Sequence, residues 1–218
     1  MVMAVGVAAV AAFFTRYQAF IERMVGSSIP MSPAEKLMFV MYAMNMGIVV
    51  TTFWWFVVRI RYDSFSWTAG HWIVWSWGAV TSVTLALAWL VLKAVDWNLI
   101  ESLQKTMSLI SAIFWLGGLL IAILIIRGFL LTRGYWRWPL GSLAVNSSYE
   151  LVVLEANSLT LGLNVLIVVS LVVCSGIDYR KHLRHDWMHH VGVLAVGVMM
   201  LTQVFSYLYF TFFAIPPS

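Results

Sequence analysis

The sequence carries little charge for its length. Only 10% of its 218 residues are charged, against roughly 25% in soluble domains, while 62% are hydrophobic and the mean hydropathy is +0.89. This composition excludes an ordinary soluble domain and predicts a chain that lies in lipid or in protein buried within lipid. No polar block is long enough to fold separately, so we expect one integral membrane domain over residues 1–218.

Cysteine is almost absent, and basic residues form no cluster large enough to bind nucleic acid. Cys174 stands alone in an apolar run, so it can form no intrachain disulfide and indicates no redox compartment. The net charge of +4 comes from residues scattered one to three per loop. That distribution is typical of membrane anchors and excludes a basic stripe that could neutralise phosphates.

Long uncharged runs dominate what is present. Five of them reach about 20 residues or more, the length a helix needs to cross roughly 30 Å of hydrocarbon. A sixth apolar stretch begins at the N-terminus but is short, so it is expected either to span or to lie at the interface. None alternates like a barrel strand, which predicts an all-α bundle of six spans, or five plus an N-terminal interfacial helix. The expected spans are 1–22, 37–58, 72–92, 106–127, 156–177 and 191–215.

The lysine and arginine distribution predicts a topology. The loops after the first, third and fifth spans hold more of these residues than the loops after the second and fourth, which places the former on the cytoplasmic or matrix side. The C-terminus then lies on the opposite side. The longest loop, 127–155, is aromatic and lightly charged, so we expect it to lie on the membrane surface or under a partner.

Four of the five histidines fall within one short stretch: His182, His185, His189 and His190. His185 and His189 are four residues apart, which puts both imidazoles on one helical face, and Asp186 is a plausible N-cap for the last helix. With His182 and Asp186 they could form a zinc or iron site. Alternatively, the stretch is a basic interfacial loop that binds lipid head groups, or a pH-sensitive element.

The HxxxH spacing of His185 and His189 is similar to that of seven-helix membrane hydrolases that hold zinc. That resemblance implies an earlier serine or histidine and an aspartate on further helices. The sequence pattern shows no such set, so no family is assigned.

Two other residues are candidate sites. His71 begins the third span and could help to bind a haem or a pigment shared with another subunit. The predicted topology puts it on the opposite membrane face from the histidine cluster, so the two could not share one haem. Glu155 precedes the fifth span, and a carboxylate within the membrane would be a proton or cation site, whereas in the head-group region it would be structural.

The expected function follows from what the spans lack. The second, third, fourth and sixth spans have no deep Lys, Arg, Asp or Glu, while the twelve tryptophans exceed what anchoring needs and suit a surface for lipid, quinone, pigment or another subunit. The sequence therefore favours a structural or cofactor-supporting subunit of a larger energy-transducing complex, respiratory or photosynthetic, with membrane lipids and other subunits as partners. Two alternatives are a small-solute transporter or channel, and a metal-dependent membrane enzyme at the histidine cluster.

Overall fold

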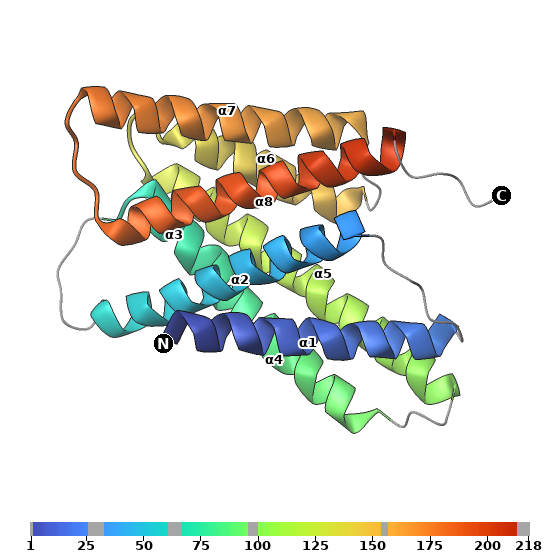
Figure 1. Cartoon of the computed structure of the whole chain (residues 1–218). Coiled ribbons are helices and arrows are strands. Elements are labelled where there is room, and N and C mark those ends of the chain that lie inside the picture. The colour runs from blue at the N-terminus through green and yellow to red at the C-terminus, as the bar shows by residue number, and fades with distance from the viewer. Residues whose placement is uncertain (1, 26–32, 61–66, 96–99, 154–156, 213–218) are drawn as a thin grey trace.

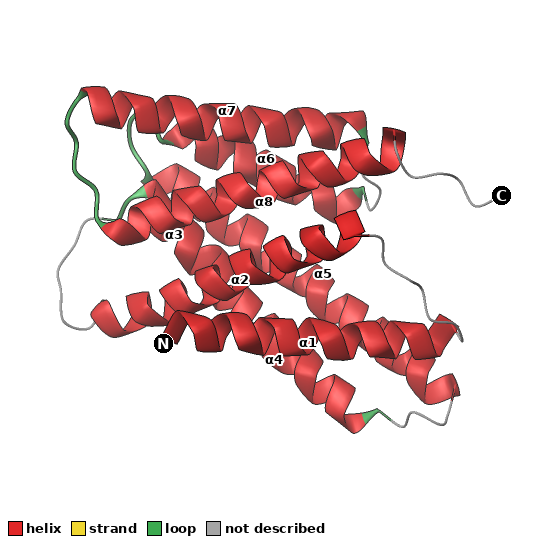
Figure 2. Cartoon of the chain, in the orientation of Figure 1, coloured by secondary structure: helices red, strands yellow, loops and turns green. Residues whose placement is uncertain are grey.

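Figure 1 shows a bundle of helices that run back and forth between two ends, some of them crossing the others obliquely. The structure, a computed structural model, describes residues 2–25, 33–60, 67–95, 100–153 and 157–212. Figure 2 shows that these residues form helices joined by short loops, and the described part of the chain contains no strand. The all-α prediction is therefore confirmed.

The helices follow the apolar runs closely, because in lipid a helix satisfies all its backbone hydrogen bonds internally. The elements are α1 (Val2–Val25), α2 (Pro33–Arg59), α3 (Ala69–Ile73), η1 (Val74–Gly78), α4 (Ala79–Ala94), α5 (Ile100–Leu131), α6 (Arg137–Val152), α7 (Ser158–Arg180) and α8 (Trp187–Phe212). Here α3, η1 and α4 form one continuous path in which η1 is a π-helical turn.

Five of these paths are long and apolar enough to cross a membrane: Lys36–Arg59, Ala69–Ala94, Glu101–Leu131, Ser158–Arg180 and Trp187–Phe212. The protein is therefore an integral membrane protein in contact with lipid. The N-terminal segment is also a helix, α1, and it packs along α2.

The prediction of one long loop over residues 127–155 is wrong for its central part. Its residues form α6, which packs against both α5 and α7 and buries Leu140, Leu143 and Asn146. Sixteen residues of helix extend about 24 Å, nearly the thickness of the hydrocarbon core. This helix was not predicted from the sequence because it is short and carries the charged residues Arg137 and Glu150.

Because α6 adds a helix between α5 and α7, it changes which of the loops between helices lie at the same end of the bundle. One end of the bundle, here called the histidine end, holds the start of α3, the end of α7 and the start of α8 (left in Figure 1). The other, called the glutamate end, holds the end of α6, the start of α7 and the end of α8. His71 and the histidine-rich stretch are thus at the same end.

The main core lies among α3, η1, α5, α6, α7 and α8, where Ile73, Ile125, Leu143, Ile167 and Val196 are fully buried. Large apolar side chains such as Leu90, Leu130 and Val172 point outward and are more than half exposed in the isolated chain. In a bilayer, lipid covers such residues, so burial inside the protein is concentrated between the helices.

The aromatic residues around the predicted link after the second span divide into two groups. Trp54 and Trp55 are exposed, as a lipid-facing belt requires. Phe56 and Trp67 instead pack edge to face, and Trp72 lies against Trp67 with ring centroids 4.7 Å apart. The second group therefore forms an aromatic layer beneath the histidine end.

Candidate metal centre

A buried aspartate organises the histidine end. Asp178 lies in the last turns of α7 and is 5% exposed. The Tyr135 hydroxyl donates to its Oδ1, and the Trp136 Nε1–H donates to Oδ2 at 2.9 Å. Burial, followed by the hydrogen bond to Asp178, raises the pKa of Tyr135 to about 12, so the phenol stays protonated and donates. The carboxylate is therefore held in one orientation within an apolar setting.

The chain reversal after α7 returns His185 to Asp178. His182 has a φ of 52°, the left-handed conformation that commonly ends helices, and the Leu183 N–H donates to the Asp178 carbonyl. The following residues then place His185 Nε2 2.9 Å from Asp178 Oδ2. His182, predicted as a possible ligand, is exposed and forms the turn.

The third member comes from the first turn of α8. The His189 ring stacks on that of His185, with centroids 4.2 Å apart, and stands perpendicular to Trp136. Asp178, His185 and His189 each offer one ligand atom, and these atoms all lie within 4.8 Å of one another. Ligand atoms around a tetrahedral ion at about 2.1 Å lie about 3.4 Å apart, so small side-chain adjustments would suffice to bind one.

His190, also predicted as a ligand, lies beside this group without joining it. Its ring centroid is 5.4 Å from that of His189, and the side chain is exposed. The structure thus brings together two of the four predicted histidines and adds Asp178, which the sequence reading had treated only as the boundary of a span. A lone acidic residue near the end of an apolar run, eleven residues before His189, was the signal that could have identified it.

His71 lies at this site, which corrects the prediction that it faces the opposite side of the membrane. Its Nε2 is 3.1 Å from Asp186 Oδ2, and Asp186 directly precedes α8. The error arose because α6 was not counted as a pass through the bundle. An earlier histidine and an aspartate therefore do accompany His185 and His189, contrary to the sequence reading.

The bonds around His71 fix its tautomer. The Thr68 backbone N–H donates to His71 Nδ1 at 3.1 Å, so that nitrogen accepts and Nε2 carries the hydrogen that is donated to Asp186. Both ring nitrogens have partners, so coordinating a haem iron would require His71 to lose one of them.

The Thr68 hydroxyl connects His71 with His189. Its oxygen lies 2.7 Å from His71 Nδ1 and 2.8 Å from His189 Nδ1. One hydroxyl has one hydrogen, and His71 Nδ1 already accepts, so this hydrogen is donated to His71. The Gly70 N–H donates to His189 Nδ1 at 3.3 Å, so binding a metal through His189 Nε2 would require Nδ1 to exchange this bond for donation to the Thr68 oxygen.

Asp186 anchors the network from the solvent side. Its Oδ1 accepts the His189 backbone N–H at 3.0 Å, which confirms the predicted N-cap, and Arg59 approaches Oδ2 at 3.3 Å. Burial opposes ionisation, but the His189 N–H, His71 and Arg59 together hold the pKa of Asp186 below its usual range. Asp186 is therefore a carboxylate that orients His71 and the start of α8.

Two glycines allow these helices to meet. A Cβ added at Gly70 would collide with the His189 backbone, and one added at Gly192 would collide with the Gly70 carbonyl oxygen. The backbones of α3 and α8 are therefore in direct contact, which brings Thr68 and His71 to His189.

The other predicted site residue, Glu155, lies outside the described residues. Comparison with known proteins assigns no relative: no family model, no curated protein and no solved structure matches the chain.

Proposed function

We propose that this protein is a metal-dependent membrane hydrolase whose metal ion is bound by Asp178, His185 and His189. The observation that carries the proposal is the convergence of these three ligand atoms within 4.8 Å, from the end of α7, the following loop and the start of α8. Two imidazoles and one carboxylate are the ligand set of several catalytic zinc sites, and three protein ligands leave a position for water.

A zinc-class ion at this position would supply a bound water of lowered pKa, the nucleophile of such hydrolases. The protein residues supply the rest. Tyr135 and Trp136 hold Asp178, while the bonded series Asp186, His71 and Thr68 orients the His189 ring. Mutating outer partners of this kind commonly lowers metal affinity by about tenfold to a hundredfold. His71 is thus a positioning residue in this proposal.

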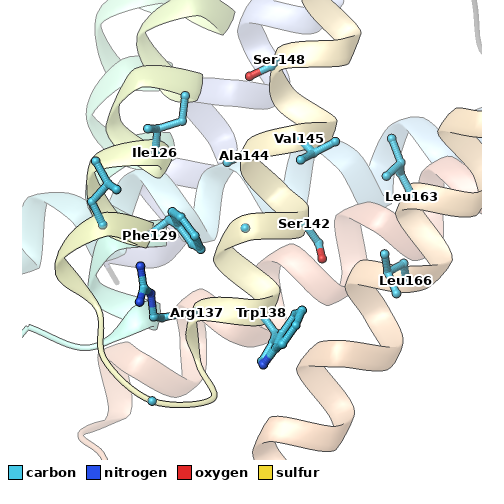
Figure 3. Close-up of a pocket in the computed structure, with 13 residues that line it drawn as sticks. Ile126, Phe129, Arg137, Trp138, Ser142, Ala144, Val145, Ser148, Leu163 and Leu166 are labelled. Carbon is cyan, nitrogen blue, oxygen red and sulfur yellow. The ribbon is translucent and has the colours of Figure 1, made fainter.

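The substrate that fits best is an acyl lipid. An apolar groove of about 1050 Å³ runs between α5, α6 and α7, and Figure 3 shows Arg137 and Trp138 at its loop end. Arg137 directly follows Trp136, whose indole contacts Asp178. An acyl chain along Ile126 and Leu166 would place its anionic head group at Arg137, at the end of the groove where α6 begins.

Metal analysis of the purified protein tests the proposal. After zinc supplementation and removal of loosely bound ions, we expect about one zinc per chain, falling below about a tenth in His185→Ala and His189→Ala because each loses a ligand. His182→Ala and His190→Ala are matched controls, since both histidines lie in the same stretch but outside the group of three. Size-exclusion chromatography confirms that each variant is folded.

Three results would contradict it. Wild-type protein without a stoichiometric ion would remove the metal, and equal loss in His190→Ala and His189→Ala would show that the histidine-rich surface binds metal unspecifically. Lipid hydrolysis that persists after the metal has been chelated would show that the metal takes no part in the reaction.

The subunit role expected from the sequence rested on the absence of a group of catalytic residues and on the tryptophan-rich surface. The cluster at Asp178 removes the first of these reasons, so a place in an energy-transducing complex stays a prediction that rests on the aromatic surface. Its test is native extraction: co-purification of a large assembly would support it.

A further inference from the structure

The glutamate end holds a second polar site, about 21 Å along α7 and α8 from the metal centre by helical rise. A cavity of about 780 Å³ opens between α2, α6, α7 and α8. Glu150, Asn164 and Gln203 contribute polar side chains to it. Nothing in the proposed hydrolase uses these residues.

Glu150 is the acidic group of this cavity, and its setting keeps it in place. The Asn146 Nδ2–H donates to Glu150 Oε1 at 2.9 Å, and Gln203 lines the same cavity. Because the amide nitrogen of Asn146 is directed at Glu150, its amide oxygen is turned away from the carboxylate.

Buried oxygens without partners point to a missing ligand. Asn164 is 2% exposed, and its Oδ1 has no hydrogen-bond partner although the residue lines the cavity. Gln203 Oε1, also buried, lacks one as well. Buried carbonyl oxygens are rarely left unpaired, so each of these oxygens is expected to gain a hydrogen-bond donor or a cation when the adjoining cavity is filled.

The charge of the site selects a monovalent cation. Among the described residues that line the cavity, Glu150 carries the one carboxyl group, and none is Lys or Arg. One positive charge neutralises the carboxylate, whereas a divalent ion would leave an excess charge within an apolar bundle.

The walls select an organic cation over a bare ion. Phe39, Tyr42, Tyr207 and Phe210 line the same cavity. Aromatic faces attract ammonium groups and bind apolar bodies, and the volume is that of small-molecule sites. A sodium or potassium ion would fill only a small part of it.

We propose that this cavity binds a protonated amine with an apolar body, its ammonium group held by Glu150, Asn164 and Gln203. The ammonium donates hydrogen bonds to the carboxylate and to the two amide oxygens, while the aromatic side chains enclose the apolar part. The site is independent of the proposed hydrolase activity.

Calorimetric titration of the full chain in detergent tests this, with phenethylammonium chloride as the probe and phenethyl alcohol as its neutral counterpart. We expect wild-type protein to bind the ammonium at least about tenfold more tightly than the alcohol, since hydrogen bonds to charged groups are the stronger ones. Glu150→Gln should abolish this preference by weakening the ammonium alone, and Asn164→Ala should weaken it less.

Glu101→Gln is the matched control, because Glu101 is 79% exposed and pairs with Lys105 on the surface of α5. Equal affinity of wild-type protein for the two probes would overturn the proposal, as would unchanged ammonium binding in Glu150→Gln. Sodium or potassium chloride binding in place of the ammonium would also overturn it. If Glu150→Gln does not fold, the comparison of the two probes on wild-type protein still decides.

Discussion

At the residue scale, the metal centre depends on how Asp178 is held. A carboxylate that is 5% exposed is costly unless donors surround it, and Tyr135 and Trp136 supply them from the start of α6 and the loop before it. These two aromatic residues look like belt anchors in the sequence. In the structure their polar atoms face inward, so their role is to orient a ligand.

Trp136→Phe removes the indole N–H and keeps most of the aromatic packing. We expect zinc affinity to fall by about tenfold, because outer partners fix the orientation of ligating carboxylates. Competition with a chelator of known affinity measures the change. Trp138→Phe is the control, since Trp138 is 76% exposed and makes no contact with Asp178 that the structure records. Equal effects of the two changes would assign the loss to general aromatic packing.

At the element scale, the crossing of α3 and α8 determines whether His71 can reach His189. Gly70 and Gly192 let the two backbones touch, and the Thr68 hydroxyl then bridges the two imidazoles. Helices carrying larger side chains at these positions would stay further apart and lose the bridge.

Gly192→Ala should therefore separate the helices, since the new methyl group would overlap the Gly70 carbonyl oxygen. We expect a loss of about 1–3 kcal/mol in stability, as for other overpacked sites, together with weaker zinc binding. Thermal unfolding in detergent and chelator competition measure the two effects. Gly197→Ala on the same helix has nothing within 4 Å of the added Cβ and should be neutral or stabilising. A Gly192→Ala protein as stable as Gly197→Ala would contradict the close crossing.

At the scale of the whole molecule, α6 decides the topology. Counting it as a pass places the described basic residues mostly at the histidine end: Arg59, Arg127, Arg133, Arg137, Arg180, Lys181 and Arg184. The glutamate end has Arg16, Arg23, Lys36, Lys93 and Lys105. The positive-inside rule therefore still predicts that the loop before α8 is cytoplasmic and the C-terminus is on the other side.

Cysteine accessibility separates this arrangement from the six-span reading. In a Cys174→Ala background, Leu183→Cys at the histidine end and Glu101→Cys at the glutamate end should react with an impermeant maleimide from opposite sides. The side chains are exposed in both places, so reactivity reports sidedness. Labelling from the same side would support six spans and contradict α6 as a pass.

The long apolar runs determined the helices by themselves. A run of about 20 apolar residues can satisfy its backbone in lipid only as a helix, so composition and charge spacing suffice to predict α2, α5, α7, α8 and the continuous path from α3 through α4 to within about six residues at each end. The Asp186 cap was predictable for the same local reason, since capping depends on neighbours in the sequence.

The tertiary structure alone decided which polar residues meet. His71 and His189 are separated by more than a hundred residues, and their contact depends on α6 adding a pass and on Gly70 and Gly192 allowing close approach. Neither condition appears in a hydropathy pattern, because α6 is short and partly polar and because a glycine shows its role only opposite another helix. The sequence alone determined a helical membrane protein with a histidine-rich loop. Packing between distant helices selected Asp178, His185 and His189 as the candidate metal ligands.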